Sequence, residues 1–371
     1  MSIVIQPYRE EHESAVQAFN HRLVTATSDP DLVFYERSAP KWLPKVEGCP
    51  LYNEYFVAIE DHVVRGAYAL KHERASIAGR GESAVACYHH PLSEGIVNRS
   101  FSTVGSLLLR DALRRQPVLY ALGMGGYDRP LPKMLKAMGW TLALVPFYFR
   151  IVHPFRFLRQ MTTIRNSRWR RWLMDLGAFS GMGWAALTVA QNVKRLRITG
   201  VGSIESMEVD EFPDWTDALW LEAKDDYRLA SIRDRKTLAR LYPAEDKHLT
   251  KLCVFRQGKP VGWAVVGERR KDAKYGSLRV GSIVDCWARP EHAPYVILAA
   301  TQTLEKQEVD LILSNQSHQQ WCRALESAGY WRAASNFIFA YSKNLSALLG
   351  PAQISEFHLN RANGDGLPRN F

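Results

Sequence analysis

Three polar side chains in the second half of the chain have the chemistry of an acid–base site. Asp285 interrupts the apolar stretch GSIVDCWA, Asn315 ends the stretch VDLILSN, and His358 lies in the polar stretch SEFHLNRANGDG near the C-terminus. A carboxylate in apolar surroundings has a raised pKa and an imidazole titrates near neutral pH, so either group can act as a general base. We therefore take Asp285, His358 and Asn315 as candidate catalytic residues. A paired structural carboxylate and a helix cap remain open as the alternative roles of Asp285 and Asn315.

Four further polar residues are candidates for binding a substrate. Ser335 and Asn336 enter the last aromatic stretch of the chain, and Arg361 and Asp365 follow His358. A disordered C-terminal end is the default expectation. An acid, a cation and a base within one short segment are, however, more than a solvated tail needs, and if the tail folds back into the cleft between the repeats, His358 could act as a general base near neutral pH.

The first half offers two loops that suit a cofactor. Ser93, Glu94 and Gly95 belong to one loop, and Gly125 and Gly126 belong to the other, LGMGGYDRPL. Glycine lets a ligand approach the backbone closely, so we take these five residues as cofactor-binding candidates. The second loop is not a P-loop, because it has no Gly-Lys-Ser/Thr. Solvated or merely tight turns are the alternatives.

The cysteine and histidine pattern argues against a metal site. The five cysteines are scattered without a Cys-x-x-Cys, and His89-His90 has no Cys or acidic residue at ligand spacing. Free thiols are typical of a reducing compartment, and the start MSIVIQPYREEHE lacks the basic and apolar regions of a signal peptide. We predict a cytoplasmic protein without a bound metal.

Two pairs of similar stretches indicate that the chain contains a duplication. LKAMGWTLALVPFYFRI resembles LESAGYWRAASNFIFAY, and YFVAIEDHVVRGAYALK resembles LCVFRQGKPVGWAVVGE. Gly139 and Gly329 of the first pair are 190 residues apart, and Gly66 and Gly262 of the second pair are 196 apart. A nearly constant offset with the order retained is the pattern of a repeated domain. A length of 371 residues also favours two domains.

Each repeat alternates strand-like and helix-like stretches. We expect a hairpin at 251–268 preceded by a helix at 214–225, and a matching hairpin from 55 onward. Strands and helices then follow in both halves: 83–90, 103–115, 118–124, 130–139 and 145–151 in the first, and 279–288, 295–307, 309–315, 318–329 and 335–343 in the second. Such an order predicts an α+β fold with an α/β-type mixed sheet in each half.

The positive charge is concentrated in one segment between the repeats. The net charge is +10, yet residues 150–197 contain ten basic residues and one acidic residue. The rest of the chain is nearly neutral, which argues against a DNA-binding protein. The segment RNSRWRRWLMDLGAFSGMGWAALTVAQNVKRLR is predicted to be a helical connector. It either packs on the domains or binds an anionic membrane surface through residues 159–197, at the inner membrane face.

The order of elements resembles the GNAT acyltransferase superfamily twice over, with NQSHQQWCRALESAGY as the most specific match to the family's Asn-x-x-Ala…Gly-Phe ending. The resemblance implies an N-terminal GNAT-like domain at 1–155, a connector at 156–199, a C-terminal GNAT-like domain at 200–345 and a tail at 346–371. In the family, an Arg/Gln-x-x-Gly-x-Gly/Ala turn holds the coenzyme A pyrophosphate. The corresponding turns, HHPLSEGIVNRSFSTVG and ARPEHAPYV, lack that motif. Leu135 and Leu325 replace the tyrosine that often serves as its general acid.

These patterns together predict an acyltransferase. The resemblance implies an acyl thioester donor, acyl-CoA or an acyl-carrier protein, and an amine or hydroxyl acceptor. We expect the acceptor to be a small molecule or a saccharide such as a cell-envelope precursor. A Fem-like transferase that uses aminoacyl-tRNA is one alternative. A tandem protein that has lost catalysis and binds a ligand or partner is the other.

Overall fold

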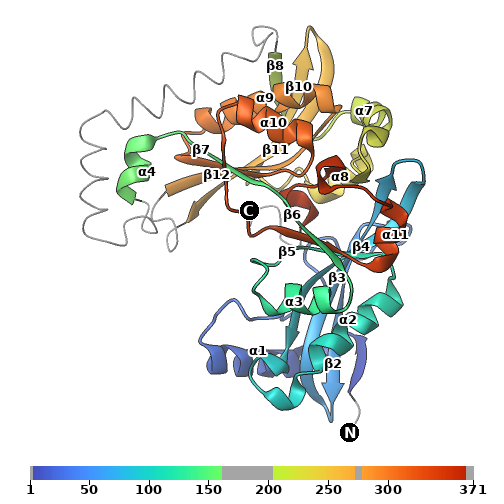
Figure 1. Ribbon diagram of the computed structural model, residues 1–371. Coiled ribbons are helices and arrows are strands. Elements are labelled where there is room, and N and C mark those ends of the chain that lie inside the picture. Colours follow the sequence, from blue (N-terminus) through green and yellow to red (C-terminus); the bar gives the residue numbers. More distant parts are fainter. Residues whose placement is uncertain (1–2, 161–203, 272–277, 365–371) are drawn as a thin grey trace. The chain divides into compact units, whose positions relative to one another are not determined.

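The computed structural model of the protein describes residues 3–160, 204–271 and 278–364 (Figure 1). The chain forms two compact units: unit 1 comprises Met1–Ala143 and Ile338–Pro351, and unit 2 comprises Leu144–Phe337 and Ala352–Phe371. Of the predicted connector, α4 (Pro154–Gln160) covers the described beginning. The rest of the connector and Asp365 lie outside the described residues. Within the described part of the chain, no helix is long and apolar enough to cross a membrane.

Unit 1 is built on one mixed sheet. Its strands follow the order β1-β2-β3-β4-β5-β15-β6. The first four are an antiparallel meander, β4 and β5 are parallel, and β15 is antiparallel to β5. The strands are β1 (Val4–Pro7), β2 (Tyr52–Glu60), β3 (Val63–Ile77), β4 (Gly81–Ser93), β5 (Leu119–Gly123), β6 (Thr141–Leu144) and β15 (Ile338–Tyr341), and the helices are α1 (Glu13–Thr27), α2 (Val104–Arg115), α3 (Pro130–Ala137) and α11 (Lys343–Leu349).

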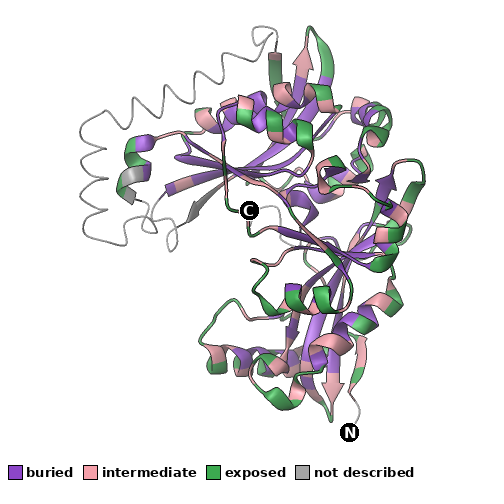
Figure 2. Ribbon diagram, viewed as in Figure 1, coloured by how far each residue is buried: buried purple, intermediate pink, exposed green. Residues whose placement is uncertain are grey.

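Helices cover both faces of the unit 1 sheet. Leu108 and Leu109 of α2 and Leu135 of α3 pack with the side chains of one face, and Val16 and Phe19 of α1 pack with those of the other. The strands are largely buried, whereas the outer sides of the helices are exposed (Figure 2). This burial matches the helical periodicity of apolar residues in the sequence.

Unit 2 repeats this plan on a second sheet, in the order β14-β7-β13-β12-β11-β10-β8. Unit 2 also contains a short parallel pair outside this strand order, β9 (Leu229–Ser231) with β16 (Phe357–His358). The other strands are β7 (Phe147–Ile151), β8 (Ile204–Val209), β10 (Leu249–Arg256), β11 (Lys259–Lys271), β12 (Leu278–Ala288), β13 (Leu311–Asn315) and β14 (Trp331–Ala333), and the helices are α7 (Trp215–Ala223), α8 (Arg235–Leu241), α9 (Ala293–Lys306) and α10 (Gln319–Ser327). The predicted α+β class with two mixed sheets is confirmed.

The two aromatic strands are exchanged between the sheets. β7, from the first repeat, lies between β13 and β14 of unit 2. β15, from the second repeat, pairs with β5 of unit 1. The sequence-based assignment gave each of these strands to the repeat that precedes it, and the structure corrects that assignment. Because FYFRI and IFAY have the same apolar, aromatic character, their pattern identifies a strand but not the sheet that it joins.

Candidate functional site

A bulge opens β4 of unit 1 near the point where its pairing with β5 ends. β4 pairs with β5 at Ala86–Leu119 and Cys87–Tyr120. On its other edge His89 lies opposite Ala69 and Leu92 opposite Ala67, so His90 and Pro91 share one residue of β3. His90 has a positive φ of 50°. An extra residue of this kind bends a strand and leaves part of its backbone without ladder partners, which is common beside functional sites.

Ser93, Glu94 and Gly95 form the turn that follows this bulge. The Ser93 hydroxyl accepts a hydrogen bond of 3.1 Å from the Gly95 backbone N–H. Glu94 is buried and accepts hydrogen bonds from Arg22 and Arg65, at 3.0 and 2.9 Å. A side chain on Gly95 would place its Cβ 2.6 Å from a backbone carbonyl oxygen. These three residues therefore shape the turn, and a role in binding a cofactor stays a prediction.

The same turn leads into the N-terminus of α2. Arg99 opens the short 3-10 helix Arg99–Phe101, and α2 begins at Val104. Arg99 is exposed and, within the described residues, has no ion pair. In the aligned family motif, Arg99 occupies the Arg/Gln position, and Ser102 and Val104 replace the two glycines. A helix N-terminus with free N–H groups beside a guanidinium can bind an anion such as a phosphate group.

Unit 2 contains the corresponding turn in an altered form. Arg289 follows Arg99 by 190 residues, the same spacing as Gly139 and Gly329. Its guanidinium lies 3.1 Å from Asp226 and 3.2 Å from Glu291. Pro294 stands in the first turn of α9 and has no N–H to donate. This turn has therefore lost a backbone donor, and its cation is already paired.

The C-terminal segment occupies the edge of unit 2 where β12 and β13 separate. These strands pair from Val280–Leu311 to Ile283–Ser314. Beyond that point, Gln316 forms an antiparallel bridge with Asn360, and the Ser317 N–H donates to the Leu359 carbonyl at 3.0 Å. The default expectation of a disordered tail is wrong as far as the described residues extend, because this segment forms β16 and a 3-10 helix at Arg361–Asn363. It folds into unit 2 itself.

Asp285 lies beside this C-terminal segment, and its two carboxylate oxygens together accept four hydrogen bonds. It is fully buried, and its carboxylate accepts hydrogen bonds from Arg233 Nε and Tyr242 OH at 2.7 Å each. Asn360 Nδ2 at 2.7 Å and the Cys286 N–H at 2.9 Å complete the set. A carboxylate saturated in this way has no free oxygen lone pair for a substrate proton. The geometry favours the paired structural role.

His358 is enclosed by aromatic rings. Its ring centroid lies 4.9 Å from those of Tyr227 and Trp287 and 5.7 Å from that of Trp321. Burial, more than the opposing attraction of Asp285, lowers the pKa of His358 to about 3. The imidazole is therefore neutral and packed as a core side chain.

The other predicted residues make local structural contacts. Arg361 Nη1 donates to Asn315 Oδ1 at 3.1 Å, so these two predicted residues do lie together. Ser335 Oγ donates to the Val145 carbonyl at 2.6 Å, and Asn336 beside it is exposed. The two glycines of the loop after β5 have positive φ, at 74° for Gly125 and 120° for Gly126, as a tight turn requires.

Sequence reasoning missed a polar row that crosses the unit 1 sheet. Asn53, Lys71, Cys87 and Tyr120 are direct cross-strand neighbours on β2, β3, β4 and β5. They therefore share one face of the sheet, and all four are buried. His89 lies two residues after Cys87 on the same face and is also buried. A lysine and a histidine within apolar strands were the available signal, but one strand alone does not show its neighbours.

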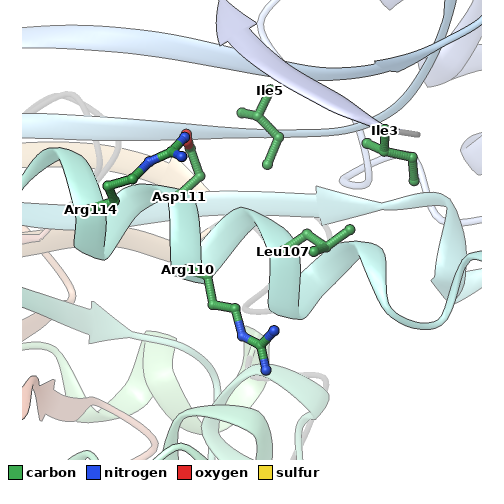
Figure 3. Close-up of a pocket in the computed structure, with 6 residues that line it drawn as sticks. All are labelled: Ile3, Ile5, Leu107, Arg110, Asp111 and Arg114. Carbon is green, nitrogen blue, oxygen red and sulfur yellow. The ribbon is translucent and has the colours of Figure 1, made fainter.

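A shallow pocket of about 300 Å³ lies elsewhere on unit 1, beside β1 and the middle of α2 (Figure 3). Asp111 lines it, and its carboxylate accepts hydrogen bonds from Tyr68, Arg114 and Arg115 at 2.6–2.7 Å. This network ties α2 to the sheet, so it serves the fold. Among the described residues, no group of three or more His, Cys, Asp and Glu side chains could hold a metal ion.

Solved structures share this fold. No family model and no curated protein matches the sequence. The GCN5-related N-acetyltransferase from Anabaena variabilis is 9% identical, with a TM-score of 0.51 over 91% of this chain and 72% of that one. A Saccharomyces cerevisiae N-myristoyltransferase structure with bound myristoyl-CoA is 9% identical, with a TM-score of 0.52 over 99% of this chain and 86% of that one. The protein has the GNAT fold in a tandem arrangement, as the resemblance implied.

Proposed function

We propose that the protein transfers an acyl group from a coenzyme A thioester and that unit 1 binds this donor. The observation that carries the proposal is the contrast between the two turns. Arg99 is exposed and lies five residues before the start of α2, whereas Arg289 is paired with Asp226 and Glu291 and is followed by Pro294 in the first turn of α9. Among the described residues, the N-terminus of α2 has a cation without an ion pair and no proline in its first turn, which favours it as the pyrophosphate site.

The strand edges of the two units support the same choice. In unit 2, Leu359 and Asn360 occupy the edge where β12 and β13 separate. In unit 1, β4 continues past its last pair with β5, Cys87–Tyr120, to Ser93. The N–H groups of this bulged stretch suit the negative charge that develops on the thioester oxygen during acyl transfer. We propose that the acyl carbon lies beside this stretch.

The acceptor that fits this chemistry is an amine or hydroxyl of a small molecule or saccharide. A cell-envelope precursor is favoured by the basic segment 159–197, which would draw the protein to an anionic surface. Attack of the acceptor on the thioester carbon releases the free thiol of coenzyme A, which makes the reaction easy to follow.

The test uses the full chain and coenzyme A thioesters of increasing acyl length. Titration calorimetry measures donor binding, and thiol release with mass spectrometry of the acceptor measures transfer to a panel of amines and aminosugars. The proposal predicts saturable donor binding and one released thiol for each acylated acceptor. If no thioester binds, the proposal is wrong, and a protein that binds a ligand or partner without catalysis becomes the better account.

A further inference from the structure

We propose that His89 is the general base of unit 1 and that Asn53 orients its ring. This inference rests on the proposed function, because it needs a thioester beside β4. It assigns a catalytic role to a residue in the polar row of the sheet.

Position is the first argument. His89 lies on β4 two residues after the last pair with β5 and directly before the bulge at His90. Its side chain is on the face opposite α2, since Tyr88 belongs to the α2 core and neighbouring side chains of a strand alternate. A base at this place adjoins the stretch of β4 assigned to the acyl carbon.

The hydrogen bonds of Asn53 fix which nitrogen of His89 is free. Asn53 Nδ2 donates to the Trp42 carbonyl at 2.9 Å, so its Oδ1 faces the ring of His89. Nε2 of His89 lies 3.4 Å from that oxygen and must carry a proton to bond with it. Nδ1 then holds the lone pair. It is buried and, among the described residues, has no hydrogen-bond partner.

The surroundings keep the imidazole unprotonated. Burial lowers the pKa of His89 well below its usual range, and the charges of His90 on β4 and Lys71 on β3 add to the effect. A neutral imidazole is the form that accepts a proton. A further neighbour is Tyr35 of the loop between α1 and β2, whose ring lies edge-on to that of His89 at 6.4 Å and is partly exposed. The proposal requires the acceptor to enter along this loop, because the Tyr35 side chain is only half-buried.

The proposed step balances as follows. The acceptor nitrogen attacks the thioester carbon and forms the new C–N bond, while its proton moves to Nδ1 of His89. The C–S bond then breaks and its electron pair leaves on sulfur. The imidazolium returns the proton to the thiolate, so the products are the amide and the free thiol, and His89 is neutral again.

The test separates chemistry from donor binding. His89→Gln places an amide N–H near the position of Nε2 and removes the base. We expect turnover to fall by about 100- to 10,000-fold, the usual contribution of a general base. The dissociation constant of a coenzyme A thioester should stay within about twofold, because the base does not contact the pyrophosphate. The matched control is His292→Gln in unit 2, whose side chain makes no helix-cap hydrogen bond; it should leave both quantities unchanged.

A substitution of Asn53 provides a second test, which remains informative if the His89→Gln variant does not fold. Asn53→Asp puts a negative charge beside Nε2, which stabilises the imidazolium and raises the pKa of His89. We expect the acidic limb of the turnover–pH profile to move upward while KM for the donor is unchanged. Normal turnover in His89→Gln, or an unmoved profile in Asn53→Asp, would overturn the inference and leave the proposed function standing. If the wild-type protein binds no thioester, the proposed function fails and this inference fails with it.

Discussion

Asn360 donates a hydrogen bond of 2.7 Å to the buried carboxylate of Asp285, and through this contact the C-terminal segment is fixed inside unit 2. Asp285 sits beside the bulge of β12, the strand that corresponds to β4 of unit 1. β12 therefore has a bulge, as β4 does. Its open edge, however, is covered by the C-terminal segment of the same chain. The two halves share a fold and differ in what their strand edges can bind.

Arg99 and Arg289 give a matched pair of substitutions. If the donor pyrophosphate binds at α2, Arg99→Ala removes a charge-assisted hydrogen bond and should weaken thioester binding by about 10- to 100-fold. Arg289→Ala should leave affinity unchanged, because its guanidinium is paired with Asp226 and Glu291. Calorimetry on both variants decides the matter. Equal losses, or a loss in Arg289→Ala alone, would contradict the assignment to unit 1.

Asp285→Asn should lower the free energy of unfolding and leave the turnover of the folded protein unchanged. The change leaves the buried guanidinium of Arg233 without its counter-charge, which costs about 3–5 kcal/mol in comparable buried pairs. Turnover per folded molecule should remain close to the wild-type value, since the proposed base, His89, lies in unit 1. Chemical denaturation and activity at low temperature measure the two effects. A stable but inactive variant would restore Asp285 as the candidate base.

The lowered pKa of the buried His358 ring predicts how the free energy of unfolding depends on pH. Its pKa is about 3 in the folded protein and 6.5 when exposed, so below pH 6.5 the unfolded state binds a proton that the folded state does not. Stability should therefore fall with pH between 6.5 and 3, by about 1.4 kcal/mol per unit from this group. In His358→Phe, the loss between pH 7 and pH 5 should be smaller by about 2 kcal/mol. Urea unfolding at both values tests this, and an identical pH dependence in the two proteins would argue against the neutral buried ring.

The exchanged strands predict how fragments behave. A fragment of residues 1–155 lacks β15 and a fragment of residues 200–371 lacks β7, so each leaves a gap in its sheet. Neither should give the circular dichroism and cooperative unfolding of a folded domain when produced alone. Co-expression of the two fragments should restore both properties. Independent folding of either fragment would mean that its own aromatic strand can close the sheet.

The elements were more predictable from sequence than the site. Alternating apolar residues at 251–268 identified the hairpin realised as β10 and β11, and the repeat at Gly139 and Gly329 identified the duplication. The strand exchange escaped prediction because pairing partners are set by tertiary packing. Asp285 looked catalytic because a polar residue in an apolar stretch carries no sign of its partner, and His358 looked catalytic because its polar segment carries no sign of the aromatic rings that enclose it. His89 was considered only as a metal ligand, and its contact with Asn53 could not be predicted because Asn53 lies on another strand of the folded sheet.

Hydrogen–deuterium exchange of the full chain, with and without a non-reactive coenzyme A thioester analogue, tests donor binding by unit 1 most directly. The account predicts new protection at the end of β4 and the start of α2, in residues 88–106. It predicts no change at the end of β12 and the start of α9, in residues 284–296. Protection confined to the unit 2 segment would contradict the account.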